Sequence, residues 1–395
     1  MESTLKRTWA EISLDNLTHN FETIRRQVGP KAKLLGVVKA DAYGHGAVRV
    51  AKHLQRLGAG YLAVSNLDEC EELRVNGITL PILMLGFTPA DQAERILKND
   101  MTQAVPNLAI AEAYSSAAVR AGGTMKVHIK LDTGMGRLGF QCDDAHFDAS
   151  LRDILKILTL PGLDVEGVFT HFCVSDEAAD ECVEFTKIQH DRFLRMIDAV
   201  ETQGNFRFRL HHCCNAGGIA SYPEWAWDMV RCGIILYGTG DLAERMGMKP
   251  VMTVKTTVST IKDFDPDTSI SYGRQFFTTR PSRIAVLPIG YADGLPRNLS
   301  QKGGRVLIRG TFCPMVGRMC MDQLLVDVTD LPEAAPGDVV TLIGRDGAQE
   351  LRAEELAARC GTITNELLSR LGRRLELQKV PRSSQSSGRS AETRG

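Results

Sequence analysis

The chain has 395 residues, of which 43% are apolar and 24% charged, and its formal net charge is −1 at pH 7. This length predicts two domains, because few single domains other than (β/α)8 barrels are so long. The balanced charge gives no reason to expect nucleic acid or a membrane as a partner, and the lack of a long apolar run and of a signal-peptide pattern in residues 1–7 predicts a cytoplasmic protein.

The segment 34–237 alternates apolar, β-branched runs with helical patterns. The eight runs predicted as strands are 34–38, 61–64, 82–85, 103–105, 126–131, 167–172, 208–213 and 230–237. The predicted helices between them are 47–57, 67–76, 89–98, 108–121, 145–158, 179–203 and 216–221. Such alternation implies a parallel sheet, and eight units of this length fit an α/β fold of the (β/α)8 TIM-barrel type better than an open sheet.

The pattern changes near residue 245, where short apolar runs separated by Gly, Pro and Asp indicate a mainly β domain. Its predicted strands are 251–261, 269–272, 283–289, 305–308, 311–316, 323–328 and 338–343. Two helices are predicted late in it, at 352–360 and 364–371. We therefore assign residues 12–244 to the barrel and residues 1–11 and 245–381 to the β domain. The Ser- and Arg-rich segment 382–395 is predicted to be a disordered tail.

Polar residues follow five of the eight predicted barrel strands. In a (β/α)8 barrel the chemistry takes place at the C-terminal ends of the strands, where the connecting loops meet. The polar residues at or after these ends are Lys39, Tyr43, Lys130, Arg137, His171, His212, Asn215 and Arg231. Core packing does not require such a convergence, whereas a binding site does.

Two explanations are open for Lys39, which leaves the buried run 34–38. A lysine at a strand end commonly extends its amine into solvent. It can instead keep its amine in a poorly solvated mouth, where burial lowers the pKa and frees a nucleophile for Schiff-base chemistry. The glycine-containing loops 215–218 and 233–234 favour a phosphate nearby. A lysine beside a phosphate site indicates pyridoxal 5'-phosphate (PLP) as the cofactor.

Two other patterns suggest different ligands. The run 211–214, with two histidines and two of the ten cysteines, resembles a set of metal ligands. Adjacent residues of a strand point to opposite faces, so we predict no metal site there. Residues 134–139 match the G-x-G-x-x-G pattern of dinucleotide-binding loops, with Asp153 downstream. That pattern needs a helix that opens within the glycines, so an NAD enzyme is the weaker alternative.

Residues 37–46, which read Val-Val-Lys-Ala-Asp-Ala-Tyr-Gly-His-Gly, resemble the PLP-lysine signature of the bacterial alanine racemases. Further runs that resemble this family follow in its order, at 130–139, 166–172, 212–215, 230–238, 271–273, 289–294 and 317–322. The resemblance spans nearly the whole chain, from Trp9 to Leu377. It implies a PLP-binding barrel and a β domain in a head-to-tail homodimer. It also implies the interconversion of L- and D-alanine, which supplies D-alanine for peptidoglycan.

The resemblance implies two bases for this reaction. Lys39 would bind the cofactor covalently and act on one face of the amino acid, and Tyr272 of the partner subunit would act on the other. Racemisation removes the α-proton from one face and returns a proton to the other, so two opposed bases suit the chemistry. A tyrosine is a base only where its surroundings stabilise the phenolate, and this is the role implied for His171 and Arg231.

The resemblance implies further contacts by position. Arg231 would hold the pyridine nitrogen of the cofactor. The other implied cofactor contacts are Tyr43, His171, Asn215, Ala216, Gly233, Ile234 and Asn365. The implied substrate contacts are Arg137, Tyr291 and Met321. The residues implied to support these groups are His212, Lys130, Cys320 and Asp322.

Two positions concern the details of the reaction. Some members of the family carbamylate the lysine that matches Lys130, which places an anion beside Arg137, and we predict the same here. Many members have a tyrosine where this chain has Asn365, and the smaller amide leaves room for a substrate hydroxyl. A serine-preferring or broad alanine/serine racemase is therefore the alternative to an alanine racemase. A non-catalytic PLP-binding protein is the alternative from another class, and Tyr272 in a second domain counts against it.

Overall fold

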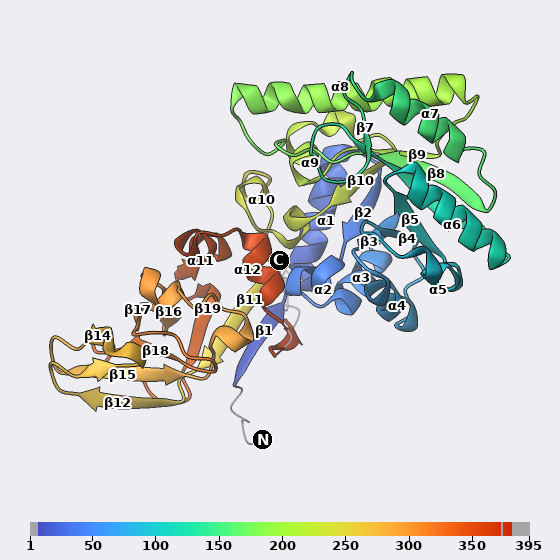
Figure 1. Ribbon diagram of the computed structural model, residues 1–395. Helices are drawn as coiled ribbons and strands as arrows, with labels where there is room; N and C mark the ends of the chain where they lie inside the picture. The colour runs from blue at the N-terminus through green and yellow to red at the C-terminus, as the bar shows by residue number, and fades with distance from the viewer. Residues whose placement is uncertain (1–6, 373, 381–395) are drawn as a thin grey trace, which may run out of the picture.

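Parallel strands close into a barrel in the first part of the computed structural model, which describes residues 7–372 and 374–380 (Figure 1). The strands are β2 (Lys33–Val37), β3 (Tyr61–Val64), β4 (Ile82–Met84), β5 (Met101–Val105), β6 (Met125–Asp132), β8 (Leu163–Phe169), β9 (Leu210–His212) and β10 (Met229–Cys232). They lie in the order β10-β2-β3-β4-β5-β6-β8-β9. Hydrogen bonds from Asp228 N to His211 O (3.2 Å) and from Arg231 N to Cys214 O (3.0 Å) join the two ends of this order. The predicted (β/α)8 barrel is confirmed.

Helices cover the outside of the barrel (Figure 1). Those after the strands are α2 (Lys39–Gly44), α3 (Ala47–Arg56), α4 (Leu67–Val75), α5 (Ala93–Lys98), α6 (Leu108–Arg120), α7 (Phe147–Ile157), α8 (Asp180–Gln203), α9 (Ala216–Ser221) and α10 (Asp241–Arg245). The sequence analysis missed α1 (Leu14–Val28), although Ser13 caps it by accepting a hydrogen bond from Asn16 N at 3.2 Å. No helix of the described residues is long and apolar enough to cross a bilayer.

Two predicted strands are wrong in part. The run 230–237 stops being a strand at Cys232, and Ile234–Tyr237 is a 3-10 helix. A short buried apolar run suits a strand and a helical turn equally well. The turn is the stable choice here because it brings the Tyr237 hydroxyl to Val37 O at 2.7 Å. The run 251–261 divides into β11 (Met252–Thr257) and β12 (Thr260–Phe264), which lie far apart in the strand order of their sheet.

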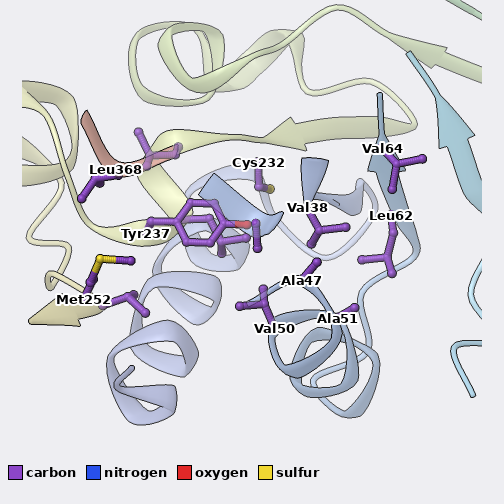
Figure 2. Close-up of a cluster of buried hydrophobic side chains, with 14 of the residues drawn as sticks. Val38, Ala47, Val50, Ala51, Leu62, Val64, Cys232, Tyr237, Met252 and Leu368 are labelled. Atoms are coloured by element: carbon purple, nitrogen blue, oxygen red, sulfur yellow. The ribbon is translucent and has the colours of Figure 1, made fainter. Parts of the chain in front are cut away.

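The apolar core has two layers around the barrel wall. The interior layer consists of alternate residues of the strands, namely Leu35, Val37, Tyr61, Ala63, Leu83, Leu210 and Met229. The outer layer lies between strands and helices and continues into the β domain. Figure 2 shows part of it, in which Val38 at the end of β2, Tyr237 and Leu368 belong to one cluster. This shared core joins the two parts of the chain.

The C-terminal part of the chain is mainly β, as predicted. Its large mixed sheet has the order β12-β15-β18-β17-β16-β19-β11-β1-β21, with β20 beside β19. The strands not yet given are β1 (Thr8–Ile12), β15 (Ser282–Leu287), β16 (Arg305–Ile308), β17 (Thr311–Val316), β18 (Leu324–Asp327), β19 (Val339–Asp346), β20 (Gln349–Leu351) and β21 (Glu376–Lys379). A hairpin pairs β13 (Ser269–Ile270) with β14 (Phe276–Phe277). The predicted tail 382–395 lies outside the described residues.

Two helices follow this sheet, α11 (Ala353–Cys360) and α12 (Thr364–Arg370), close to their predicted positions. Helix α12 lies directly against α2, the turn that follows β2 (Figure 1). At Gly44 a Cβ atom would lie 2.2 Å from Leu368 O and 2.7 Å from Leu371 O, and Gly44 has φ of +80°. Both the space and the backbone conformation therefore require glycine. The close approach brings Asn365, near the start of α12, to the end of β2.

Candidate active site

A cavity of about 750 Å3 opens at the C-terminal ends of the barrel strands. The predicted site residues that line it are Lys39, Tyr43, Lys130, Arg137, His171, Asn215, Ala216, Arg231, Gly233, Ile234 and Asn365. All but Asn365 lie at the ends of barrel strands or in the loops that follow them, and Asn365 comes from α12. The structure thus brings the predicted barrel residues together around one space.

Lys39 begins a turn with a left-handed backbone. Residues 40–43 include no glycine, yet all have φ between 51° and 54°. Each left-handed residue costs roughly 1–2 kcal/mol, so other groups must hold the turn. The Glu69 carboxylate accepts hydrogen bonds from Ala40 N (2.8 Å) and Ser65 N (2.7 Å), and the Asp41 carboxylate accepts one from Ala47 N (2.6 Å). Strain of this kind is typical of functional sites.

A larger fraction of the Lys39 amine is in the neutral, nucleophilic form than in an exposed lysine. Burial, and then the Arg137 charge, lower its pKa, while Glu69 raises it. Burial also raises the pKa of Tyr43 to about 12, so this phenol keeps its proton near neutrality. The Tyr43 oxygen lies 3.5 Å from where a Cβ of Gly233 would be. A nucleophilic amine and a hydroxyl donor therefore open onto the same cavity.

The Arg231 guanidinium is buried, and the four hydrogens of its two NH2 groups are shared among five acceptors. Nη1 donates to Nδ1 (3.2 Å) and O (3.1 Å) of His212. Nη2 donates to Thr170 O (2.7 Å), Cys213 O (3.0 Å) and His171 Nδ1 (3.2 Å). Burial lowers the pKa of Arg231 to about 10, so the group stays charged near neutrality. Its Nε has no partner among the described residues and remains available to a ligand in the cavity.

His171 is a neutral imidazole in this arrangement. Its Nδ1 accepts the hydrogen bond from Arg231, so the ring proton is on Nε2. Burial and the charges of Arg231, Lys130, Arg137 and Lys39 lower the pKa of His171 well below 6.5. The ring can therefore donate one hydrogen bond from Nε2.

Lys130 is a buried amine close to other cations. Burial, and then the Arg231 charge, lower the pKa of Lys130 to about 7, so a large fraction of the amine is neutral at physiological pH. Its Nζ donates to Leu131 O at 2.6 Å and lies 5.3 Å from the centre of the Phe169 ring. The amine is therefore able to react as a nucleophile.

The loop after β9 is shaped by Asn215. Its Oδ1 accepts hydrogen bonds from Gly218 N (3.0 Å) and Ser175 Oγ (2.9 Å), and its Nδ2 donates to Phe172 O (2.9 Å). Both ends of the amide are thus engaged within the loop. The first N–H groups of a helix have no intrahelical partner, so those of Ala216 and Gly217 can meet an anion.

Apart from Asn365, the predicted residues of the β domain form a second group, which does not line the cavity. Its members are Tyr272, Tyr291, Cys320, Met321 and Asp322. Hydrogen bonds from Tyr291 N to Cys320 O (3.2 Å) and from Ala292 N to Met321 O (3.0 Å) join the two loops that carry most of them. Tyr272 is 64% exposed and Met321 is 54% exposed. Within one chain, Lys39 and Tyr272 therefore do not line the same cavity.

Tyr272 projects from a strained turn. The prediction of a strand through 269–272 is wrong here, because β13 ends at Ile270 and the chain turns sharply. Ser271, Gly273 and Arg274 have φ of 66°, 73° and 47°. The Ser271 hydroxyl donates to Arg318 O at 2.6 Å and ties the turn to the loop that carries Cys320. A held, strained turn presents the phenol to the surface.

The two patterns that suggested other ligands have structural roles. His211 and His212 point in opposite directions, since His211 Nδ1 lies 2.8 Å from Asp228 Oδ2 while His212 faces Arg231. In the loop 134–139 the Asp132 carboxylate accepts hydrogen bonds from three backbone N–H groups, each at 3.0 Å. The loop leads into β7 (Phe140–Gln141), and no helix opens within its glycines.

Sequence reasoning missed three carboxylate and imidazole groups behind the cavity, namely Glu69, His128 and Glu166. His128 precedes Lys130 by two residues on one strand, so strand alternation could have placed it on the same face. Asn66 caps α4 and accepts from Glu69 N at 2.9 Å, a spacing typical of a capping box. Glu166 begins the family-like run 166–172, but strand alternation could not place its side chain, because a β-bulge between β6 and β8 breaks the alternation beside it.

Comparison with known proteins agrees with this arrangement. The family model for the alanine racemase N-terminal domain matches residues 12–241, and that for the C-terminal domain matches residues 251–379. Alanine racemase 2 of Caldanaerobacter subterraneus subsp. tengcongensis is 42% identical over 374 residues, 94% of each chain. The solved alanine racemase of Clostridium difficile 630 has a TM-score of 0.89 and 40% identity, covering 96% of this chain and 97% of its own. Its complex with cycloserine has a TM-score of 0.87 and 38% identity, covering 96% of both chains. This chain therefore belongs to the alanine racemase family.

Proposed function

We propose that this chain is a PLP-dependent alanine racemase. The observation that carries the proposal is the cavity that Lys39, His171 and Arg231 line together. It exposes both a nucleophilic amine and a guanidinium whose Nε is available to a ligand. Family membership supports the reaction. A relative solved with cycloserine supports an amino-acid ligand in the corresponding cavity of this chain.

The residues of the cavity fit PLP. Lys39 offers an amine for covalent attachment, Arg231 offers Nε to the pyridine nitrogen, and the Tyr43 hydroxyl offers a donor to the phosphate. The N–H groups at Ala216–Gly217 and at Gly233–Ile234 supply further donors. Bound PLP withdraws electrons from the α-carbon of the amino acid and so acidifies its α-proton. A permanent cation at the pyridine nitrogen disfavours protonation there, because two positive charges would then face each other.

Two residues move the α-proton in this proposal. Lys39 exchanges a proton with one face of the α-carbon, and Tyr272 of the partner subunit exchanges one with the other face. The exposed position of Tyr272 supports this division, since a head-to-tail homodimer can seat one β domain over the cavity of the other chain. His171 can then donate from Nε2 to the phenolic oxygen and stabilise its anion. Arg137 and the partner's Met321 meet the substrate.

The direct test is a chiral assay of the PLP-loaded protein with L-alanine. We expect L- and D-alanine to reach equal amounts, because the two enantiomers have the same free energy. Lys39→Ala should abolish both the covalent attachment of PLP and the racemisation. A wild-type protein that holds PLP and leaves L-alanine unchanged would contradict the proposal.

Serine is the alternative substrate, and Asn365 is the observation that favours it. The Asn365 side chain lines the cavity, and its amide has no hydrogen-bond partner among the described residues. We expect Asn365→Tyr to lower kcat/KM for L-serine relative to L-alanine by about tenfold, because it fills space and removes an amide that can bind the hydroxyl. Asn365→Leu is the matched control, since it keeps the volume and loses only the hydrogen bonds. Equal effects on both substrates in both variants would exclude a role for Asn365 in specificity.

We also propose that Lys130 is carbamylated. In this step the neutral amine attacks the carbon of CO2, a nitrogen–carbon bond forms as one carbon–oxygen π bond opens, and one N–H proton leaves to solvent, so the neutral amine becomes an anionic carbamate beside Arg137. Because the pKa of Lys130 is about 7, the reactive neutral amine increases as the pH rises through neutrality. We expect 13C-labelled bicarbonate to give a carbamate signal that grows over this pH range and is missing in Lys130→Ala. A wild-type spectrum without that signal at saturating bicarbonate would refute the proposal.

Three further expectations accompany this function. The division of the chain at residues 12 and 245 is proposed to separate a cofactor-binding part from a part that completes the partner's site. Cytoplasmic location is proposed together with a supply of D-alanine for peptidoglycan. None of these three expectations changes the chemistry assigned to the cavity.

A further inference from the structure

We propose that Glu166, inside the barrel, positions Arg231 through His128 and His212, because a carboxylate that can only accept holds every hydrogen bond leading to the guanidinium in the one direction that Arg231 requires. The inference rests on the proposed function, in which Arg231 meets the cofactor. Glu166, His128 and Tyr61 do not line the cavity, so they act as positioning residues.

The chain of contacts is continuous. Arg231 Nη1 lies 3.2 Å from His212 Nδ1, and His212 Nε2 lies 2.9 Å from His128 Nδ1. His128 Nε2 lies 3.2 Å from Glu166 Oε2, which also accepts a hydrogen bond from the Tyr61 hydroxyl at 2.5 Å. Four neighbouring strands, β10, β9, β6 and β8, carry the first four groups, and Tyr61 reaches across the interior from β3.

Which atom donates in each of these hydrogen bonds follows from the residues at the two ends of the series, Arg231 and Glu166. Arginine can only donate, so His212 Nδ1 must be an acceptor and the His212 proton must be on Nε2. That proton makes His128 Nδ1 an acceptor in turn, and the His128 proton is then on Nε2. A carboxylate can only accept, so Glu166 receives this last N–H. Both histidines are thus neutral and each has a single allowed tautomer.

The electrostatics agree with this pattern. Burial lowers the pKa of His128 and, together with neighbouring charges, places that of His212 well below 6.5, so both rings stay neutral. Burial of Glu166 raises its pKa, but the hydrogen bonds from His128 and Tyr61 outweigh this and lower it to about 2. Glu166 is therefore an anion near neutral pH.

A polar chain of this kind is not needed to fill the barrel. Seven apolar residues already fill much of the interior, and replacing buried ionic groups by apolar ones of similar size is often neutral or stabilising. Arg231 also has three backbone carbonyls as acceptors. What these hydrogen bonds add is a fixed direction of donation. In the reverse direction His212 Nδ1 would carry a proton, which would face an Arg231 N–H and repel the guanidinium.

Glu166→Gln is the informative variant. It keeps the size of the side chain, but an amide can donate as well as accept hydrogen bonds, whereas a carboxylate can only accept them. A glutamine can turn its NH2 group toward His128 Nε2, which permits the reversed direction, and the Tyr61 hydroxyl can accept as well as donate. Asp164→Asn is the matched control. Asp164 is a carboxylate on the same strand, but it pairs with Arg209 at 2.8 Å and takes no part in the chain.

The first measurement uses the PLP-free protein with 15N-labelled histidine, whose long-range 1H–15N spectra report which ring nitrogen carries the proton. His128→Asn and His212→Asn serve only to assign the two signals. We expect wild type and Asp164→Asn to show the Nε2–H tautomer at both rings, and Glu166→Gln to show a second tautomer. An Nδ1–H tautomer at either ring of the wild type would overturn the proposal.

The second measurement is the affinity of the PLP-free protein for PLP. We expect Glu166→Gln to weaken it by about three- to tenfold, the range for the net contribution of one ordinary hydrogen bond, and Asp164→Asn to leave it unchanged. A single tautomer with unchanged affinity in Glu166→Gln would reduce Glu166 to a structural residue and overturn the inference. If the wild type itself failed to bind PLP, the proposed function would fail, while the tautomers would still decide the direction of the chain.

Discussion

A heterodimer of one Lys39→Ala chain and one Tyr272→Phe chain should recover about half of the wild-type racemase activity, whereas each homodimeric variant should lose about a thousandfold or more. In the heterodimer one site combines the intact Lys39 of one chain with the intact Tyr272 of the other, and the second site lacks both. Two different affinity tags, purified in sequence, isolate this species from the homodimers. The expected result follows from the exposed position of Tyr272, which lies outside the cavity that Lys39 lines.

The reverse arrangement is the control. A heterodimer of a wild-type chain and a chain with both substitutions contains the same four side chains, but each of its sites lacks one base. We expect it to be inactive. If each site were instead built from a single chain, this second heterodimer would keep half of the activity and the first would have none. The two species therefore give opposite results under the two arrangements.

Gly44→Ala should destabilise the protein by about 3 kcal/mol or more and weaken PLP binding as well. The added methyl group would lie 2.2 Å from Leu368 O and 2.7 Å from Leu371 O, so α12 would have to move away from the turn that carries Lys39. A φ of +80° adds the strain of a left-handed backbone. Chemical denaturation followed by circular dichroism measures the first effect, and a PLP titration the second.

Gly58→Ala separates these two causes. Gly58 has the same φ of +80°, but a Cβ atom there would meet nothing within 4 Å. We expect it to cost only the backbone strain, about 1 kcal/mol, with unchanged PLP affinity. Equal destabilisation by the two substitutions would mean that α12 is not pressed against the Lys39 turn.

The residues of the active site could be predicted because the positions of the strand ends could be predicted from the sequence. Apolar runs that alternate with helical patterns identify barrel strands, and the ends of parallel strands converge on one rim. Lys39, Lys130, His171 and Arg231 could therefore be grouped before any contact between them was known. The resemblance to a known family added Asn365 and the second group around Tyr272.

The shape of the backbone at these residues was not predictable. The left-handed turn at 40–43 contains no glycine that would indicate it in the sequence. The groups that stabilise the turn, such as Glu69, are distant in the sequence, so local patterns do not predict it. Tyr237 was placed on a strand because a buried apolar run has no period that distinguishes a strand from a turn. The missed helix α1 is different, since the Ser13 cap was present in the sequence.

Local patterns were sufficient for the barrel and for the side chains that face its rim, because strand periodicity and the residue at a strand end depend only on neighbours in the chain. The hydrogen-bonded chain behind Arg231 depends on packing between distant segments, such as Tyr61 and Glu166, which are 105 residues apart. A bulge next to Glu166 and the close contact at Gly44 have no counterpart in sequence periodicity. They arise because close-packed elements must satisfy each other's polar groups and volumes, and that condition exists only once the chain is folded.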